Sequence, residues 1–179
     1  MNKAITRIKP IGAVALCATL LSGCGLTQQV SDGTAAIARS VFYKQVRVLH
    51  LDIAAREGVN NDSSGKPLAT LVRIYQLQDR RGFDGSDYAS LLANDSDALR
   101  AGRLAQKDIR VRPGEAITVD MPLEAGAQFV ALAAMFLSPD EANNDWRLVL
   151  RRNDLDPDTA RLIEINQQTL TLLPHKEQR

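Results

Sequence analysis

The residues best suited to chemistry in this sequence are its two histidines, His50 and His175. His50 stands beside Asp52 inside a run typical of a strand, and His175 lies in a polar C-terminal segment. A Ser-His-Asp triad or a zinc site needs several convergent ligands, and the sequence has no His/Cys/Glu cluster at metal-binding spacing. We therefore interpret His50 as a strand histidine with an ordinary hydrogen-bond partner.

Ser63 and Lys66 form the second candidate for chemistry, because Ser63-Ser64-Gly65-Lys66 matches the S-x-x-K pattern of penicillin-binding enzymes. In those enzymes the serine opens a helix, and S-D-N and K-T-G elements complete the site. Here the serine lies in a segment bounded by Gly and Pro, and both companion elements are missing. The match is therefore interpreted as part of a loop.

Three aspartates, Asp154, Asp156 and Asp158, have the spacing that begins a calcium-binding loop. The glycine that such a loop requires is absent, Ile165 replaces the bidentate glutamate, and Pro157 stiffens the middle. We interpret the segment as a solvated acidic turn. The sequence also lacks a glycine-rich phosphate loop. None of these motifs therefore predicts a catalytic, metal or cofactor site.

The N-terminus has the layout of a secretory signal. A basic segment with Lys3, Arg7 and Lys9 precedes an apolar run at residues 11–21. The run is well short of the ~20 residues that a transmembrane helix needs. It also ends on small residues, as cleaved signals do. Residues 1–23 are therefore predicted to be a signal peptide.

Cys24 directly follows the predicted cleavage point. Leu21-Ser22-Gly23-Cys24 resembles the lipobox of bacterial lipoproteins, in which the cysteine receives a diacylglycerol, the preceding peptide is removed and the new amine is acylated. Several acyl chains, at about 0.8 kcal/mol per buried methylene, hold a protein far more firmly than one chain. By the same resemblance, Gly25 in place of aspartate implies transport to the outer membrane, with the globular part facing the periplasm.

Composition limits what the mature chain can be. The 156 residues after the signal suffice for one domain with its own core. With the three basic signal residues removed, 19 basic residues face 21 acidic ones, a formal net charge of −2. This balance gives no attraction to nucleic acid. Cys17 leaves with the signal and Cys24 carries lipid, so no disulfide can form and packing alone must hold the fold.

Alternating apolar residues predict about seven strands in one domain at residues 45–173, followed by a polar tail at 174–179. The predicted strands lie at 45–55 with a bulge near Val48, 69–79, 107–123 as a hairpin around Pro113-Gly114, 128–137, 146–152 and 161–173. This pattern is typical of a mainly β, two-sheet antiparallel sandwich. Trp146 alternates with Leu148 and Leu150, which predicts that its ring faces the core.

Two helical segments accompany the strands. Residues 24–44 read as a lipidated tether with a short helix at 34–44. Residues 85–106 read as a small helical insertion, with Ser86 as a cap, Asp87 in the first turn and Ser96 capping a second turn. The insertion is expected to cover the strand at 69–79, because both faces of that strand are apolar.

The connection between the first two strands is unusually long. Loops beyond ~12 residues without secondary structure are commonly functional. Residues 54–69 are rich in Asn, Asp, Ser, Gly and Pro, which excludes a buried strand. This loop is the first place where a binding site is expected.

Several of these features together resemble one family, the outer-membrane lipoproteins of the type VI secretion system known as TssJ, SciN or VasD. The resemblance rests on the lipobox, residues 40–62 leading through Gly65 and Pro67 to residues 71–79, then Phe83, residues 86–92, a Pro-Gly turn, an apolar strand and Trp146-Arg147. Tyr75-Gln76-Leu77, followed by Phe83 and Asp87-Tyr88, is its most specific part.

The resemblance implies a transthyretin-like β-sandwich without enzymatic activity. It implies a clamp whose lipid sits in the outer membrane and whose head binds the periplasmic C-terminal domain of TssM, which joins it to a membrane complex with TssL. The binding loop of the family maps onto Asn60, Asn61, Asp62, Ser63, Ser64, Gly65, Lys66 and Pro67. The alternative is a pilotin-like or assembly-factor lipoprotein of another envelope machine.

Overall fold

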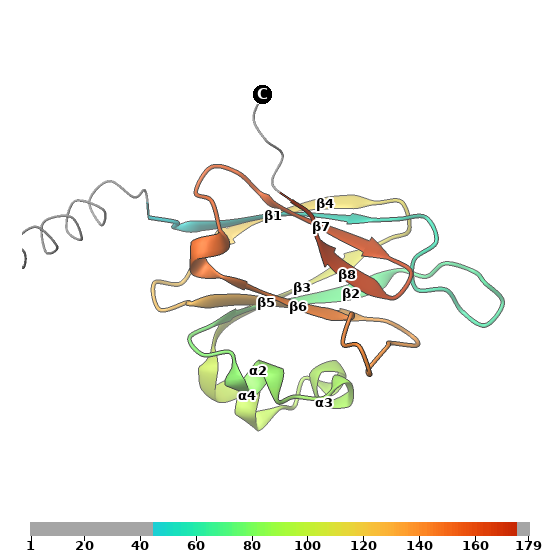
Figure 1. Cartoon of the computed structure of the whole chain (residues 1–179), viewed down its shortest axis with the longest axis horizontal. Helices are drawn as coiled ribbons and strands as arrows, with labels where there is room; N and C mark the ends of the chain where they lie inside the picture. The colour runs from blue at the N-terminus through green and yellow to red at the C-terminus, as the bar shows by residue number, and fades with distance from the viewer. Residues whose placement is uncertain (1–44, 175–179) are drawn as a thin grey trace, which may run out of the picture. The chain divides into compact units, whose positions relative to one another are not determined.

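The computed structural model describes residues 45–174, which form a mainly β domain (Figure 1). The predicted signal peptide, Cys24, the helix predicted at 34–44 and residues 175–179 of the predicted tail, including His175, lie outside the described residues. The elements are β1 (Val48–Ala55), β2 (Thr70–Leu77), α2 (Arg81–Asp84), α3 (Tyr88–Ala93), α4 (Asp97–Gly102), β3 (Arg103–Val111), β4 (Ala116–Pro122), β5 (Phe129–Met135), β6 (Arg147–Arg151), η1 (Arg152–Asp154), β7 (Arg161–Asn166) and β8 (Thr169–Leu172). No helix among residues 45–174 is long and apolar enough to cross a bilayer.

The strands form two four-stranded sheets, ordered β4-β1-β7-β8 and β3-β2-β5-β6, so the predicted two-sheet sandwich is confirmed. Leu49, Leu51 and Ile53 alternate into the core along β1, as a strand with one buried face requires. One pair departs from the antiparallel expectation, because β1 and β7 run parallel. The long chain between these two strands allows this pairing, since parallel neighbours need a crossover connection.

The predicted hairpin around Pro113-Gly114 is wrong. β3 pairs with β2 in one sheet, whereas β4 pairs with β1 in the other. The residues between them form a tight turn, in which the Glu115 N–H donates to the Arg112 carbonyl (3.0 Å) and Gly114 has φ +73°. The turn therefore carries the chain from one sheet to the other. Alternation identified both strands but carried no information about their partners.

Two of the predicted strands differ in detail from the observed ones. The pairing of β1 with β4 runs without a shift from Val48 to Ala54, so the bulge predicted near Val48 is wrong. The inward set changes before the strand begins, because Val46 is buried outside β1. The single strand predicted at 161–173 is also wrong, because a turn at residues 167–168, with Gln167 at φ +52°, divides this segment into the antiparallel strands β7 and β8.

The helical insertion covers the outer face of the sheet that contains β2 (Figure 1). Asp87 and Ser96 cap α3 and α4 by accepting hydrogen bonds from Ser90 N (2.7 Å) and Leu99 N (3.2 Å). Ser86 is not a cap, because its hydroxyl donates to the Gly82 carbonyl (2.7 Å). The insertion begins earlier than predicted, with the short helix α2.

Two arginines and two aromatic pairs fasten the insertion to the sheet. Arg73 of β2 donates to the carbonyls of Leu91 and Leu92 at the end of α3. Arg147 of β6 donates to the carbonyls of Phe83 within α2 (3.1 Å) and of Ser86 just after it (3.0 Å). The packed rings are Tyr75 with Phe83, at 5.7 Å between centroids, and Tyr88 with Trp146, at 5.0 Å. Trp146 is only 1% exposed, as predicted for a core residue.

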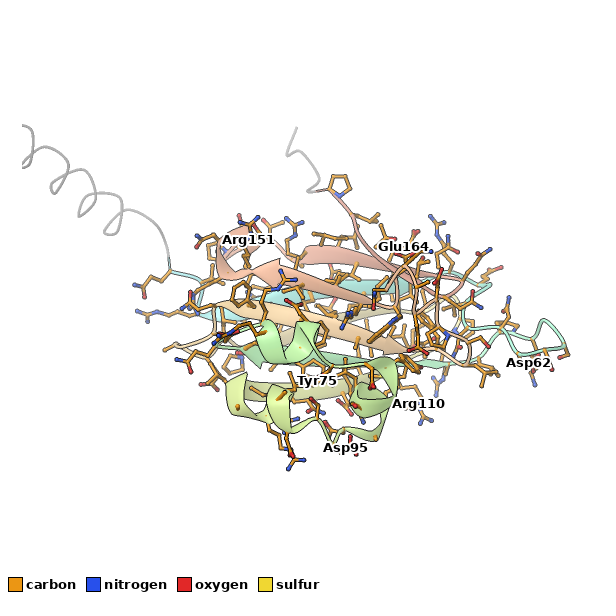
Figure 2. The ribbon with its side chains drawn as sticks, turned by 60° about the horizontal axis from the view of Figure 1, so that its bottom comes forward. Asp62, Tyr75, Asp95, Arg110, Arg151 and Glu164 are labelled. Carbon is orange, nitrogen blue, oxygen red and sulfur yellow. The ribbon has the colours of Figure 1, made fainter. Side chains whose placement is uncertain are left out.

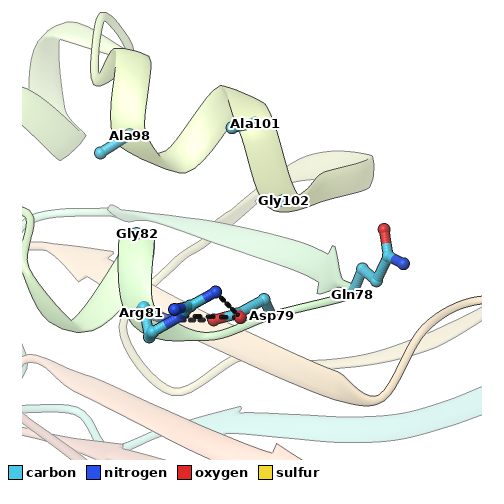
Figure 3. A pocket seen from close by; sticks show the side chains of 7 residues that line it. All are labelled: Gln78, Asp79, Arg81, Gly82, Ala98, Ala101 and Gly102. Atoms are coloured by element: carbon cyan, nitrogen blue, oxygen red, sulfur yellow. Dashed lines mark hydrogen bonds and ion pairs between the residues drawn. The ribbon is translucent and has the colours of Figure 1, made fainter.

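Helices α2 and α4 approach closely because residue 82 is glycine. A Cβ there would stand 2.2 Å from the Ala98 carbonyl oxygen. Gly82, Ala98 and Ala101 also line an open pocket of about 700 Å³, together with Gln78, Asp79, Arg81 and Gly102 (Figure 3).

Gly82→Ala is expected to destabilise the domain by about 1–3 kcal/mol, because rigid backbone rather than a flexible side chain occupies the space. Gly58→Ala is the matched control, since a Cβ at residue 58 would meet nothing within 4 Å. Urea unfolding measures both variants. Equal midpoints for the two would contradict the tight α2–α4 contact.

Gln76 is a buried polar residue that links the two sheets. Its side-chain amide donates to the Pro122 carbonyl (2.8 Å), and its carbonyl oxygen accepts from Glu124 N (2.7 Å). The side chain is fully buried in β2, while Pro122 ends β4 of the other sheet. Gln76 therefore fixes the spacing of the sheets at this end of the sandwich.

Gln76→Leu should cost about 1–3 kcal/mol of unfolding free energy, since the Pro122 and Glu124 backbone groups lose their partners. The control is Gln78→Leu, because residue 78 is exposed. Chemical unfolding measures both. A Gln76→Leu protein as stable as its control would show that water replaces both hydrogen bonds.

Candidate partner-binding loop

The long loop between β1 and β2 protrudes from one end of the sandwich. It comprises residues 56–69, and its tip, labelled by Asp62, stands clear of the strands in Figure 2. Residues 63–67 are all exposed. Every residue of the predicted binding loop, 60–67, lies here, so the sequence located the segment correctly in the fold.

The base of the loop is Asn60, which the structure buries. Its side chain is 4% exposed and its φ is +51°, a left-handed conformation that asparagine tolerates better than most residues. Its N–H donates to the Gln167 carbonyl (2.9 Å), and its Oδ1 accepts from Leu137 N (2.7 Å). Asn60 thus ties the loop to two neighbouring connections. A partner cannot reach the buried side chain of Asn60, so the role of this residue is to hold the loop in position.

The tip of the loop is organised by Asp62. Its Oδ1 accepts from Ser64 Oγ (2.6 Å), Ser64 N (2.8 Å) and Lys66 N (3.0 Å). The Asp62 backbone adds two bonds, from its N–H to the Lys66 carbonyl (2.9 Å) and from Gly65 N to its carbonyl (2.9 Å). Gly65 adopts φ +80°, which glycine allows without strain. These bonds give the exposed tip a defined shape before any partner arrives.

The same hydrogen bonds keep the Asp62 carboxylate charged. The Ser64 hydroxyl, and then the N–H groups of Lys66 and Ser64, hold the pKa of Asp62 below its ordinary value. The tip therefore presents a carboxylate already engaged by its own loop. Ser63, Lys66 and Pro67 are left as the exposed groups around it.

The residues considered for chemistry take structural roles. His50 Nδ1 lies 2.5 Å from Asp120 Oδ1 on the neighbouring strand, while Asp52 accepts from the Thr118 hydroxyl (2.7 Å). His50 thus has an ordinary partner, as predicted. Ser63 lies in the loop and opens no helix.

The predicted acidic turn is also built from local hydrogen bonds. Asp154 accepts from Arg151 N (2.9 Å) at η1, and Asp156 Oδ1 accepts from Asp158 N (2.7 Å) and Thr159 N (2.9 Å). Across residues 45–174, no three or more His, Cys, Asp or Glu side chains gather in a way that could hold a metal ion.

Four connections meet at the end of the sandwich that carries the loop. They are β1–β2, β3–β4, β5–β6 and β7–β8 (Figure 1). Hydrogen bonds join them: Gly114 N donates to Arg56 O (3.3 Å), and Asn60 joins the β5–β6 and β7–β8 connections. Sequence reasoning missed this grouping. It also extended the fifth strand through Leu137, whereas β5 ends at Met135 and Leu137 is exposed.

Comparison with known proteins agrees with this architecture. The family model T6SS-SciN, described as "Type VI secretion lipoprotein, VasD, EvfM, TssJ, VC_A0113", matches residues 47–172. No curated protein sequence matches the chain. The structure is similar to the crystal structure of the type VI secretion lipoprotein TssJ1 from Pseudomonas aeruginosa, with a TM-score of 0.61 and 20% sequence identity. The match covers 74% of this chain and 98% of that one, and it supports the fold.

Two solved chains are much more similar in sequence. One, from a structure described as "T6SS protein TssM C-terminal domain (869-1107) from EAEC", is 51% identical with a TM-score of 0.66, covering 72% of this chain and 99% of that chain. The other, from a structure described as "Type VI membrane complex", is 52% identical with a TM-score of 0.71, covering 73% and 100%. With the family model spanning most of its length, this chain belongs to the type VI secretion lipoprotein family that includes TssJ.

Proposed function

We propose that this lipoprotein anchors the periplasmic C-terminal domain of TssM to the outer membrane and, through TssM, joins the type VI membrane complex that contains TssL. The observation that carries the proposal is the identity of 51% and 52% to chains from structures of the TssM C-terminal domain and of the Type VI membrane complex. Those similarities extend over 99% and 100% of the matched chains, so they include the loop end of the domain.

The contact with TssM is proposed to use the loop at residues 60–67. Binding through a loop costs ordering entropy unless the loop is pre-shaped. The five hydrogen bonds around Asp62 and the three at Asn60 supply that order in advance. Polar tip residues on a rigid base suit a contact that must keep a fixed geometry.

The membrane attachment is proposed to be the lipid on Cys24. The chain then joins the described domain at residue 45, where Arg152 donates to the carbonyls of Val46 (2.8 Å) and Ala127 (2.8 Å). β1 leads from this point to the loop, and its eight residues span about 26 Å at ~3.3 Å per residue. The chain therefore enters the described domain before the N-terminal end of β1, and the partner loop follows the C-terminal end of the same strand, which suits a connector between a membrane and a protein.

The proposed task requires no catalysis and no cofactor. The side chains with catalytic potential are engaged in structural bonds, His50 with Asp120 and Asp62 with its own loop. The proposed activity is to hold the outer membrane and TssM together.

Affinity retrieval from envelope extracts tests the proposal. The full-length lipoprotein, solubilised in mild detergent, should retrieve TssM from its own bacterium, and should lose it when soluble TssM periplasmic domain is added in excess. Retrieval of another envelope machine's subunit without TssM would favour a pilotin-like role and contradict the proposal.

A further inference from the structure

Leu137 has the highest exposure among the large apolar side chains of residues 45–174, at 61%. It lies two residues beyond β5, at the end of the sandwich that carries the partner loop. Single exposed leucines are common and need no explanation by themselves. Leu92, 48% exposed in the helical insertion, is such a case.

Leu137 differs from Leu92 because its backbone is tied to the base of the partner loop. Its N–H donates to Asn60 Oδ1 (2.7 Å), and Asn60 is the buried residue from which the loop tip extends. On the other side, the preceding residue Phe136 is buried, and its carbonyl accepts a hydrogen bond from the Tyr88 hydroxyl. The Leu137 side chain is thus held outward in a fixed relation to residues 62–67.

We propose that Leu137 is the apolar anchor of the partner-binding surface, inserted into an apolar pocket of the TssM periplasmic domain while the loop tip makes polar contacts. This inference rests on the proposed function, since it assumes that the loop meets TssM. Burying a leucine removes apolar area from water and so strengthens binding. A polar loop without such an anchor would mainly exchange hydrogen bonds with water for hydrogen bonds with protein.

The neighbouring residues restrict the pocket that receives Leu137. Asp140 and Glu141 follow it in the β5–β6 connection, and both are exposed. The N–H and side-chain amide of Asn143 and the N–H of Ala142 hold the pKa of Asp140 below its ordinary value, so this carboxylate stays charged. Acidic side chains around the edge of the TssM pocket would be repelled by Asp140 and Glu141. The matching pocket is therefore apolar at its centre and neutral or basic at its edge.

The test is calorimetric titration of the detergent-solubilised full-length lipoprotein with the TssM periplasmic C-terminal domain of the same bacterium. Leu137→Ser should weaken binding by about tenfold or more, because the leucine loses its transfer out of water. It should also make the heat-capacity change of binding less negative, which a polar contact would not do. Leu92→Ser is the control and should bind like the wild type. Thermal unfolding of each variant checks that the fold is intact.

The outcomes separate this inference from the proposed function. Binding of Leu137→Ser within twofold of the wild type, with the loop tip still required, would overturn the anchor and leave the proposed function standing. An equal loss for Leu92→Ser would also overturn it. If neither Leu137 nor residues 62–66 affect binding, the proposed site itself is wrong.

Discussion

Replacing residues 62–66 with a Gly-Ser pair is expected to weaken binding to the TssM periplasmic domain by about a hundredfold or more, because hot-spot contacts dominate such interfaces. The domain should remain folded. All five hydrogen bonds around Asp62 lie within the replaced segment, and its ends are adjacent, since Asp62 N lies 2.9 Å from the Lys66 carbonyl. A short linker can therefore close the gap while Val59 and Asn60 stay in place.

The measurement is a titration of the lipoprotein with the TssM domain, alongside urea unfolding of both proteins. Asp62→Ala provides a graded version, because it keeps the length of the loop but removes the carboxylate that accepts from Ser64 and Lys66. We expect about tenfold weaker binding from the cost of ordering the freed tip. Asp156→Ala is the matched control, since Asp156 organises a similar turn at the opposite end of the strands. It should bind the TssM domain like the wild type.

The two results together would locate the site. Unchanged affinity after tip replacement would show that TssM contacts another surface, although the family membership of the chain would be unaffected. A loss caused equally by Asp156→Ala would point instead to a general effect on the fold.

Local chemistry was enough to predict the loop from sequence. Asp62, Gly65 and Pro67 are turn residues whose preferences act over a few positions, and the excess length of 54–69 over an ordinary connection is visible in the sequence. The same local preferences predict the cap Ser96 correctly, but they place the first cap at Ser86, one residue before the observed cap Asp87. Each hydrogen bond involved joins residues only two to four positions apart.

Features that depend on distant partners could not be predicted in this way. A period of two reports which face of a strand is buried, but it does not say which strand lies alongside. The turn at Pro113-Gly114 was therefore taken for a hairpin, although β3 and β4 join different sheets. Asn60 presents the same difficulty, because its role depends on Leu137, 77 positions away. A polar residue in a polar loop gives no sign that it is buried.

Cys24→Ser is expected to abolish retention in the outer membrane, releasing the head into the periplasm, and to stop type VI secretion. Serine lacks the thiol that is proposed to take the diacylglycerol, so we expect that none of the acyl chains is added. Each acyl chain contributes about 0.8 kcal/mol of membrane binding per buried methylene, and a single acyl chain holds a protein only marginally. A protein with no acyl chain is therefore expected to leave the membrane. The residues after the predicted signal peptide, with 19 basic and 21 acidic side chains and a formal net charge of −2, offer no compensating attraction to an anionic membrane surface.

Fractionation of cells that produce each variant measures this effect. Cys17→Ala is the matched control, because Cys17 lies in the predicted signal peptide and is removed with it. The released Cys24→Ser head should still bind the TssM domain with wild-type affinity, since the loop at 60–67 follows the C-terminal end of β1, whereas the chain enters the described domain before the N-terminal end of that strand. Secretion would then fail because the protein is no longer anchored to the membrane, although it still binds TssM. A Cys24→Ser protein that still fractionates with the outer membrane would show that TssM or another surface of the head, and not the lipid, provides the attachment.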